Sequence, residues 1–596
     1  MANQPPFNDF PKPVQGPDTD YVSKPATNPV LRGYPLSLAA TVVSSVPLLQ
    51  RYYWNVAGFG TVKDLPVLDD LPTRFHPCVT PLGDTQPMVP FTSDHLKAKY
   101  TALAGRYYTI SDYHELYKSG KATPLEVVEA LLEITTRRES QYADAWADSH
   151  GEDHRAVEAA RASTKRYAAG EPLGILDGVP FGVKDDLEVE GYICHLGVKY
   201  DSSVPEFFKK AEETVYAVRR LQEAGAIVLG KNRMHQLGAD TSGCNPTQGT
   251  PTNHMNKSYY TGGSSSGGSS ALGAGIVPFV VGTDSGGSTR IPAVYNGVYG
   301  MKTSHHRTGL TPHTNLVASP IAASVADLTV AYRVMSQPDP ACATQGRFAV
   351  SQPPGPGAKR VMGIYRDWWK EADPRVVEVC DGAVKYFEEK LGYEVVDISI
   401  PHVAEARISH TMTLISEVVE TIRSRAGRRP DWLSLLSPPN KFLLSVAAQT
   451  PASDYLKGGA MRELLMRHLA FLFQKHPGLL IMTPASPLVG WPRAPGDDSH
   501  GFSDTNTTVK NMVFTFLANF TGTPAVAAPV GYVEPEQGEG WLPIGLMATG
   551  EWGSEEQLLS WAAEAEQYLH ETYEGGRVRP KSWLDVMDLV SSDKDD

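Results

Sequence analysis

Two clusters of glycine and serine, GGSSSGG at 262–268 and GTDSGGS at 282–288, have the residue types best suited to chemistry in this sequence. Paired glycines allow backbone conformations that are closed to other residues, so successive N–H groups can point into one small space. Such donors stabilise the negative oxygen of a tetrahedral intermediate, and Ser288 at the end of the turn could present its hydroxyl to the same carbonyl carbon. The second cluster therefore indicates a serine nucleophile beside an oxyanion hole.

Two rival interpretations of these clusters are weaker. A flexible linker can have this composition, but a linker is not followed by a β-branched run and the turn TDSGGSTRIP. A phosphate-binding loop needs the pattern G-x-x-x-x-G-K-[ST]. Gly262 and Gly267 have the required spacing, but Gly268 occupies the position of the lysine. Because the cation is missing, we set the phosphate-binding interpretation aside.

A serine nucleophile needs a base, and histidine is the usual one. The sequence has no G-x-S-x-G turn, so the α/β-hydrolase triad has no anchor. The remaining candidate is Lys184, at the end of the apolar run VPFGVK (179–184). Burial disfavours the charged form of an amine, so a buried lysine loses its proton below the ordinary pKa of about 10.4. The pattern alone leaves open a lysine whose end reaches water.

The segments around these clusters alternate between helical and strand patterns. Thr123 is followed by proline and by Glu126, which is typical of a capped helix start, and further helices are predicted at 154–168 and 211–224. Short apolar, β-branched runs predict strands within 174–186, at 226–229 and at 276–281. This alternation indicates one α/β domain with a largely buried sheet.

The flanking regions lack this alternation. Residues 1–104 are rich in proline and predict an extended arm that wraps the domain. Within the arm, 35–50 is too short and interrupted to span a bilayer; we favour a helix packed on the protein body over one lying on a membrane surface. Region 403–476 is predicted to be a helical insertion whose apolar stripe, including Met461 and Phe473, faces the core, with a pocket wall as the alternative. Residues 576–596 are predicted to form a C-terminal tail.

The two clusters, together with DGVPFGVKDD at 177–186, resemble the amidase signature family in their order and in the spacing of 24 residues from Ser264 to Ser288. Supporting stretches between 224–234 and 542–559 extend the resemblance over roughly 105–570. The resemblance implies an α/β amidase-signature fold, with a central mixed β-sheet covered by helices on both faces. It places the catalytic domain at 105–575.

The resemblance also implies a Ser-cisSer-Lys triad. Ser288 would form the acyl-enzyme, Ser264 would bridge after a cis peptide, and Lys184 would be the terminal base. Further site residues follow from the same match. Gly238 would line the acyl site, and the oxyanion hole would consist of the backbone amides of Ser285, Gly286, Gly287 and Ser288.

Two charged residues and two departures from the family pattern surround the catalytic turn. Asp284 and Arg290 could brace the turn as an ion pair, with ordinary surface charges as the alternative. Val280 stands where the family usually has a small residue, and Thr289 where it usually has an aliphatic one. These departures concern the shape of the pocket rather than the chemical groups.

We therefore expect hydrolysis of a small-molecule carboxylic amide to acid and amine, without metal or cofactor. The adjacent pair His305 and His306 is interpreted as surface residues, because no metal-ligand spacing is present. Three alternatives stay open: a carbamate or ester hydrolase with the same triad, a glutamine-dependent amidotransferase subunit, and a catalytically silent binding module.

Composition narrows the partners. The chain has 596 residues, with 54 basic and 67 acidic ones, a net charge of −13 and no basic run, which argues against nucleic acid. The five cysteines form no zinc or disulfide pattern and predict reduced thiols. Without a secretory signal, a cytoplasmic protein is expected. The sequence leaves homodimerisation open.

Overall fold

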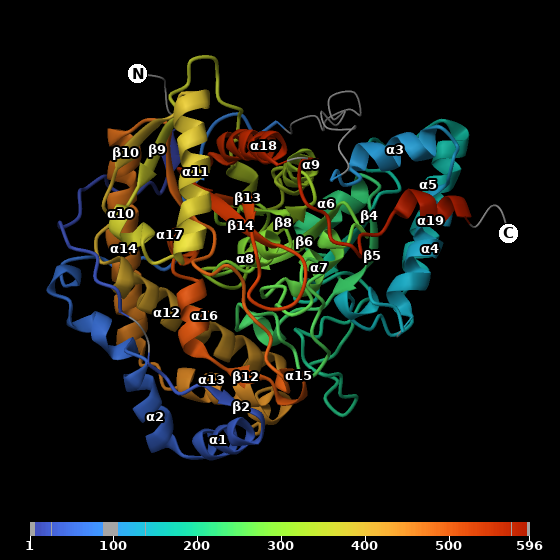
Figure 1. Ribbon diagram of the computed structural model, residues 1–596. Helices are drawn as coiled ribbons and strands as arrows, with labels where there is room; N and C mark the ends of the chain where they lie inside the picture. Colours follow the sequence, from blue (N-terminus) through green and yellow to red (C-terminus); the bar gives the residue numbers. More distant parts are fainter. Residues whose placement is uncertain (1–5, 25–26, 87–104, 138, 574, 593–596) are drawn as a thin grey trace.

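A ten-stranded mixed sheet runs through the centre of the computed structural model, which describes residues 6–24, 27–86, 105–137, 139–573 and 575–592 (Figure 1). The strand order is β10-β9-β11-β14-β13-β7-β8-β6-β4-β5. These strands are β4 (Pro180–Lys184), β5 (Ile227–Asn232), β6 (Phe279–Asp284), β7 (Tyr299–Lys302), β8 (Val317–Ala322), β9 (Val361–Ile364), β10 (Glu394–Asp397), β11 (Leu479–Pro484), β13 (Ala525–Val533) and β14 (Leu542–Thr549). The short strands β1 (Phe7–Asn8) and β3 (Thr80–Pro81) pair with each other, as do β2 (Leu31–Arg32) and β12 (Phe502–Ser503).

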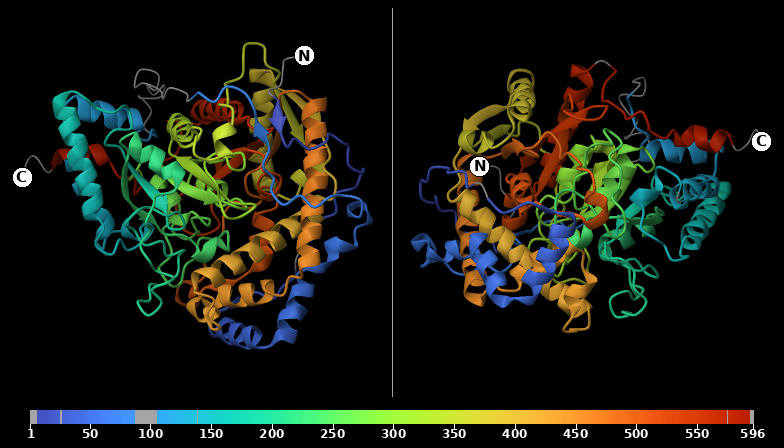
Figure 2. Two further views of the ribbon diagram at one scale, coloured as in Figure 1. Left: turned by 180° about the vertical axis from the view of Figure 1, so that it is seen from behind. Right: turned by 60° about the horizontal axis from the view of Figure 1, so that its bottom comes forward.

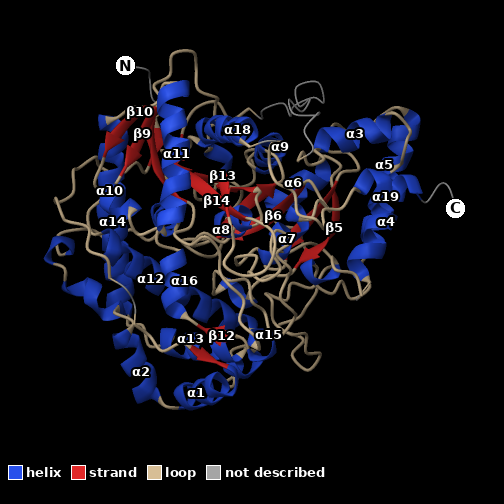
Figure 3. Cartoon of the chain, viewed as in Figure 1, coloured by secondary structure: helices blue, strands red, loops and turns tan. Residues whose placement is uncertain are grey.

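Helices cover both faces of this sheet, so the predicted fold class is confirmed (Figure 3). In the view of Figure 1, α9 (Val325–Met335) and α18 (Glu555–Thr572) lie above the sheet, and α7 (Ser266–Gly273) and α8 (Arg290–Tyr295) lie below it. The other helices before residue 400 are α1 (Gly33–Ser45), α2 (Pro47–Val56), α3 (Ile110–Lys118), α4 (Pro124–Thr136), α5 (His154–Ala169), α6 (Tyr216–Glu223), α10 (Arg366–Trp369) and α11 (Pro374–Leu391). The later ones are α12 (Val403–Arg425), α13 (Pro438–Ala447), α14 (Ala452–Lys475), α15 (Asp497–His500), α16 (Thr505–Asn511), α17 (Phe516–Thr521) and α19 (Val586–Ser592).

The local patterns of the sequence form the predicted elements. At the start of α4, Thr123 accepts a hydrogen bond from the Glu126 N–H, and the Glu126 carboxylate accepts one from the Thr123 N–H at 2.7 Å. Helix α5 ends at Gly170 in the left-handed conformation, with φ of +74°. Strands β4, β5 and β6 fall within or beside the predicted runs. Local capping and β-branched runs are therefore reliable here, because their hydrogen bonds span only a few residues.

The N-terminal arm is helical as well as extended, and its helical part lies where a helix packed on the protein body was favoured. Its helices α1 and α2 lie against the helices of region 403–476 (Figure 2). Leu36, Ala40 and Val43 of α1 are buried there, whereas Leu38 and Leu48 are exposed. The apolar stretch 35–50 is thus a helix pair packed on the protein body. Among the helices of the described residues, none combines the length and the apolar character that a membrane span requires. The arm's final part, 87–104, lies outside the described residues.

The predictions for region 403–476 and for residues 576–596 have different outcomes. Region 403–476 consists largely of α12, α13 and α14, and the apolar stripe on α14 with Met461 and Phe473 is buried in the core, as favoured. The predicted tail at 576–596 is wrong for its described part. Arg577 is buried over the Tyr107 ring, and α19 packs on α4. Apolar side chains such as Val586 anchor this segment, and residues 593–596 lie outside the described part.

Candidate active site

The predicted chemical groups gather at the carboxyl ends of three neighbouring strands. Lys184 is the last residue of β4, which runs parallel to both β5 and β6. After β5 comes the short 3₁₀ helix η4 (Gln236–Gly238), and after β6 comes the turn with Ser288. Ser264 lies just before α7. Because parallel strands end at one edge of a sheet, residues far apart in the sequence meet there, as ligand sites in α/β proteins do.

Lys184 is a buried amine in contact with hydroxyl groups. Its side chain is only 2% exposed, so the alternative of a lysine reaching water is wrong. Its Nζ lies 2.8 Å from Ser264 Oγ and 2.7 Å from Thr283 Oγ1, and the Asp186 carboxylate is 3.4 Å away. Burial lowers the pKa of Lys184, and the negative charge of Asp186 opposes this shift only in part. The result is an amine that loses its proton more readily than an exposed lysine.

The two serine-bearing turns are joined. The Gly263–Ser264 peptide is cis, as the resemblance implied. The N–H of Ser265 donates to the Ser288 carbonyl at 3.0 Å, and the side chains of Ser264 and Ser288 line the same cavity. Gly238 lies against this junction, because a Cβ atom there would be 3.2 Å from Ser264 Oγ. The structure thus brings together the two predicted serines, the lysine and Gly238.

Asp284 and Arg290 form a fully buried ion pair at the base of the turn. Arg290 Nη2 lies 2.9 Å from Asp284 Oδ1, and Nε lies 3.0 Å from Oδ2. The surface alternative for these charges is therefore wrong. Burial alone would raise the pKa of Asp284, but the Arg290 charge and hydrogen bonds from Thr289 and Gly287 hold it well below its usual range. The departure at Thr289 has a physical role, since its hydroxyl donates to Asp284 at 2.7 Å.

The other departure, Val280, is a close packing contact. A Cβ atom on Gly268 of α7 would lie 2.9 Å from Val280 Cγ2. The larger residue in β6 therefore fills the space that the glycine of the facing helix leaves open.

Two side chains from distant helices orient the first peptide groups of the turn. Asn519 Nδ2 donates to the Asp284 carbonyl at 2.9 Å, and His410 Nε2 donates to the Ser285 carbonyl at 2.7 Å. Burial lowers the pKa of His410 to about 4, so the ring is neutral with its proton on Nε2. In a trans peptide the carbonyl and the following N–H point in opposite directions. The N–H groups of Ser285 and Gly286 are therefore turned away from these helices.

At the next peptide group, one predicted donor of the oxyanion hole is used elsewhere. Thr515 Oγ1 donates to the Gly286 carbonyl at 2.7 Å, and the following Gly287 N–H donates to Asp284 Oδ1 at 2.8 Å. Gly287 has φ of +116°, and a Cβ atom there would lie 2.5 Å from Thr515 Oγ1, so only glycine fits. Its N–H holds the ion pair instead of facing the cavity. Of the four predicted donors, the N–H groups of Ser285, Gly286 and Ser288 have no protein partner among the described residues.

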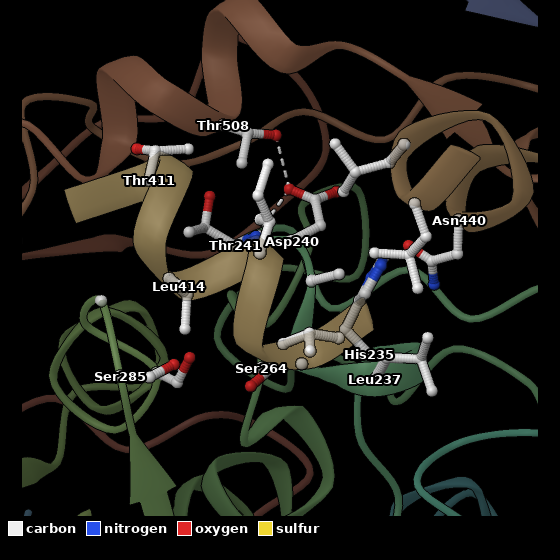
Figure 4. A pocket seen from close by; sticks show the side chains of 18 of the residues that line it. His235, Leu237, Asp240, Thr241, Ser264, Ser285, Thr411, Leu414, Asn440 and Thr508 are labelled. Atoms are coloured by element: carbon white, nitrogen blue, oxygen red, sulfur yellow. Dashed lines mark hydrogen bonds between the residues drawn. The ribbon is translucent and has the colours of Figure 1, made fainter. Parts of the chain in front are cut away.

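The hydroxyls open into a cavity of about 720 Å³ (Figure 4). Ser264 and Ser285 line one end. Away from these serines the wall is mainly apolar and comes from region 403–476 and from the N-terminal arm. The α12 and α13 helices contribute Leu414, Ile415, Val418, Phe442 and Leu444, and the N-terminal arm contributes Tyr53, Val56 and Phe59. The cavity can therefore hold a long apolar group next to the reactive hydroxyls.

One polar patch interrupts the apolar wall. The Asp240 carboxylate accepts hydrogen bonds from Thr508 Oγ1 at 2.6 Å and from the Thr241 N–H at 2.6 Å (Figure 4). Ser242 Oγ donates to the same carboxylate at 2.8 Å. Since Asp240 is satisfied by these donors, this patch is built from internal hydrogen bonds.

Several residues of the site were absent from the sequence-based prediction. Asp186 and Thr283 flank predicted motif residues and contact Lys184, so their proximity in sequence was an available signal. His410, Thr515 and Asn519 carried no such signal, because they lie more than one hundred residues from the turn they orient. Only the packing of α12 and α17 brings them to it.

Comparison with known proteins agrees with this geometry. The family model described as Amidase matches residues 129–559. The chain belongs to the amidase signature family. The similarity covers all ten strands of the central sheet and the helices that carry the site, and extends beyond the motifs themselves.

Three amidase-family relatives show the range of this similarity. A fatty acid amide hydrolase of Medicago truncatula is 31% identical over 81% of this chain and 79% of its own length. A glutamyl-tRNA(Gln) amidotransferase subunit of Chloroflexus aggregans (strain MD-66 / DSM 9485) is 28% identical over 76% of this chain and 94% of its own. A solved amidase structure is 25% identical, covers 77% of this chain and 99% of its own, and has a TM-score of 0.64.

Proposed function

We propose that this amidase-family chain hydrolyses a carboxylic amide through an acyl-enzyme on Ser288. The observation that carries the proposal is the buried contact of 2.8 Å between Lys184 Nζ and Ser264 Oγ, beside the cavity onto which Ser288 also opens. A neutral amine can accept a proton from a hydroxyl at this distance. The two serines and the lysine then act as one proton relay.

A proton first moves along the relay toward Lys184, and the relay later returns a proton to the substrate. Ser288 Oγ attacks the amide carbon, its proton passes to Ser264 Oγ, and the Ser264 proton passes to Lys184. The negative oxygen of the tetrahedral intermediate is stabilised by the N–H groups of Ser285, Gly286 and Ser288. The relay then returns the proton to the leaving nitrogen, so the amine departs with the C–N bond broken. A water molecule attacks the ester by the same relay and releases the acid.

We propose a substrate with a long apolar chain on the acyl or the amine side. Two observations support this substrate class: the mainly apolar wall of the 720 Å³ cavity and the similarity to proteins named fatty acid amide hydrolases. Free glutamine, the substrate expected of an amidotransferase subunit, has no apolar chain to fill such a wall.

The nucleophile is tested with the full chain and the Ser288→Ala variant. A fluorophosphonate is expected to add one adduct to the wild type, detected by intact mass, and none to the variant, whose turnover falls by about 10³–10⁶-fold. Comparable turnover of the variant would refute the proposal, and absence of an adduct on an inactive wild type would favour a binding module. Rates on a matched amide, ester and alkyl carbamate distinguish the three hydrolase types.

The substrate class is tested separately with primary amides of increasing chain length, and with glutamine. Leu414 lies on the cavity wall, whereas Leu456 on α14 is 42% exposed and lies outside it. Leu414→Trp is expected to lower kcat/KM at least tenfold for long-chain amides and little for acetamide. Leu456→Trp serves as the matched control and leaves both rates unchanged. Equal losses for short and long amides would contradict the long-chain proposal, and the proposal for the catalytic triad would be unaffected.

A further inference from the structure

Three histidine side chains from distant parts of the chain meet outside the catalytic cavity. His76 belongs to the N-terminal arm, whereas His305 and His306 follow β7. One ring nitrogen of each lies within 4.8 Å of the other two. The ring centroids are 4.0 Å apart for His305 and His306, and 5.8 Å apart for His76 and His306. The interpretation of His305 and His306 as surface residues is wrong, because they are 1% and 8% exposed.

The buried rings lack the hydrogen bonds that buried polar groups normally have. Neither ring nitrogen of His305 has a partner among the described residues, and Nδ1 of His306 has none either. Buried side-chain nitrogens are usually satisfied by protein or by ordered water. Simple ring packing does not account for this arrangement, since a phenyl ring would pack equally well without leaving three nitrogens unpaired. The orphaned nitrogens point instead to a ligand that accepts electron pairs.

We propose that His76, His305 and His306 bind one divalent transition-metal ion, for which Zn²⁺ is the best match. Zinc takes imidazole nitrogens at about 2.0–2.1 Å in a tetrahedral arrangement, which separates the nitrogens by about 3.3 Å. The ring nitrogens lie within 4.8 Å of one another in this structure, and a small movement of the rings would bring them to that separation. His76 is exposed, so the fourth position faces solvent and is available to water.

The surroundings of the cluster suit a ligand-binding role for His306. Its ring lies in polar contact with the Gly309 backbone. Metal-binding histidines commonly use the second ring nitrogen in this way, which fixes the orientation of the ring. Gly309 lines the catalytic cavity, whereas the three histidines do not. The metal would therefore join the arm to the loop after β7 and stabilise one wall of the cavity, without taking part in hydrolysis.

The test uses tag-free full-length protein that has been stripped with a chelator. Titration calorimetry with Zn²⁺ is expected to give one site per chain, and the bound ion raises the thermal unfolding temperature, since it binds the folded state. His76→Ala is expected to weaken binding at least tenfold and to abolish the rise. Because His76 is exposed, this variant should fold. His154→Ala, an exposed histidine elsewhere, is the matched control and behaves as wild type.

A second probe reports the ligands directly. Co²⁺ bound by three imidazoles and water gives visible absorption typical of tetrahedral coordination, which His76→Ala should lose and His154→Ala should keep. Absence of Zn²⁺ binding to the wild type would overturn the proposal. Equal affinity and equal absorption in wild type and His76→Ala would overturn it as well, because the ion would then be bound elsewhere.

Discussion

Two buried lysines at strand ends have the same perturbation and different surroundings. Lys184 ends β4, and Lys302 ends β7. Both are almost fully buried, and burial lowers the pKa of both amines, that of Lys302 to about 7. Judged by a lowered pKa alone, either amine could be the base.

Their hydrogen-bond partners separate them. Lys302 donates to the backbone carbonyls of Ala518 and Thr523, at 2.9 and 2.8 Å. A carbonyl oxygen accepts a hydrogen bond but cannot pass on a proton. Lys184 contacts the hydroxyls of Ser264 and Thr283, and both of these residues line the cavity. A lowered pKa therefore indicates burial, whereas a base also needs a group that carries protons to the substrate.

The largest expected effect separates the two lysines directly. Lys184→Ala should lower kcat/KM by about 10²–10⁴-fold, because the relay loses its terminal base. Lys302→Met should change kcat/KM only a few-fold but lower the free energy of unfolding by about 1–3 kcal/mol, since two buried carbonyls lose their donor. Steady-state kinetics and denaturant unfolding measure the two quantities. Equal kinetic losses in both variants would contradict the distinction between a lysine of the relay and a structural lysine.

The ion pair between Asp284 and Arg290 acts on both lysines: the Asp284 charge raises the pKa of Lys184, whereas at Lys302 the Arg290 charge lowers the pKa and the Asp284 charge opposes it. Arg290→Met leaves Asp284 buried without a counter-charge and should cost about 3–5 kcal/mol of unfolding free energy. Arg429→Met is the matched control, because its pair with Asp431 is exposed and should contribute little to the free energy of unfolding. Denaturant midpoints measure both. Similar losses in the two variants would contradict a structural role for the buried pair.

The two amines should also respond differently to pH. The folded pKa of Lys302 lies below its unfolded value of about 10.4, so unfolding takes up a proton between these values. The free energy of unfolding should therefore rise with pH from about 7 to 10.4, by up to about 1.4 kcal/mol per unit, and Lys302→Met should lack this part of the rise. Denaturant unfolding at several pH values measures the difference between the two proteins.

For Lys184 the readout is activity. Protonated Lys184 cannot accept a proton, so kcat/KM should fall as the pH drops below its folded pKa, by up to about tenfold per unit. This acid limb should be unchanged in Lys302→Met. If the acid limb of the pH profile shifted in Lys302→Met, the titration would belong to Lys302 and not to Lys184.

The smallest effect concerns a residue that positions the oxyanion hole. His410→Ala frees the Ser285 carbonyl and should lower kcat about tenfold with little change in KM, because the misoriented N–H groups act in the transition state. His468→Ala is the matched control, since His468 Nε2 donates to the Ser399 carbonyl at the same 2.7 Å but far along α14. The pH profile should keep its shape in both variants. A proportional rise in KM for His410→Ala would indicate a general packing defect instead.

Sequence patterns predicted what depends on neighbours along the chain. The capping box at Thr123 formed as expected and strands β4, β5 and β6 lie within or beside the predicted runs, because their hydrogen bonds and propensities are local. The failures share one cause. Burial of His305 and His306, and folding of the segment at Arg577, depend on elements hundreds of residues away. Nor could composition show that the Gly287 N–H is used by Asp284.

The residue types and their order specify the chemical groups, and they supply the glycines at the cis peptide and in the turn with several N–H groups. Tertiary structure alone decided which buried lysine contacts a hydroxyl, which helices hold the turn, and which segments wall the cavity. The physical reason is that hydrogen-bond patterns within a turn need only nearby atoms. Desolvation and proton relay depend on every element that packs around a group, and those elements come from the whole chain.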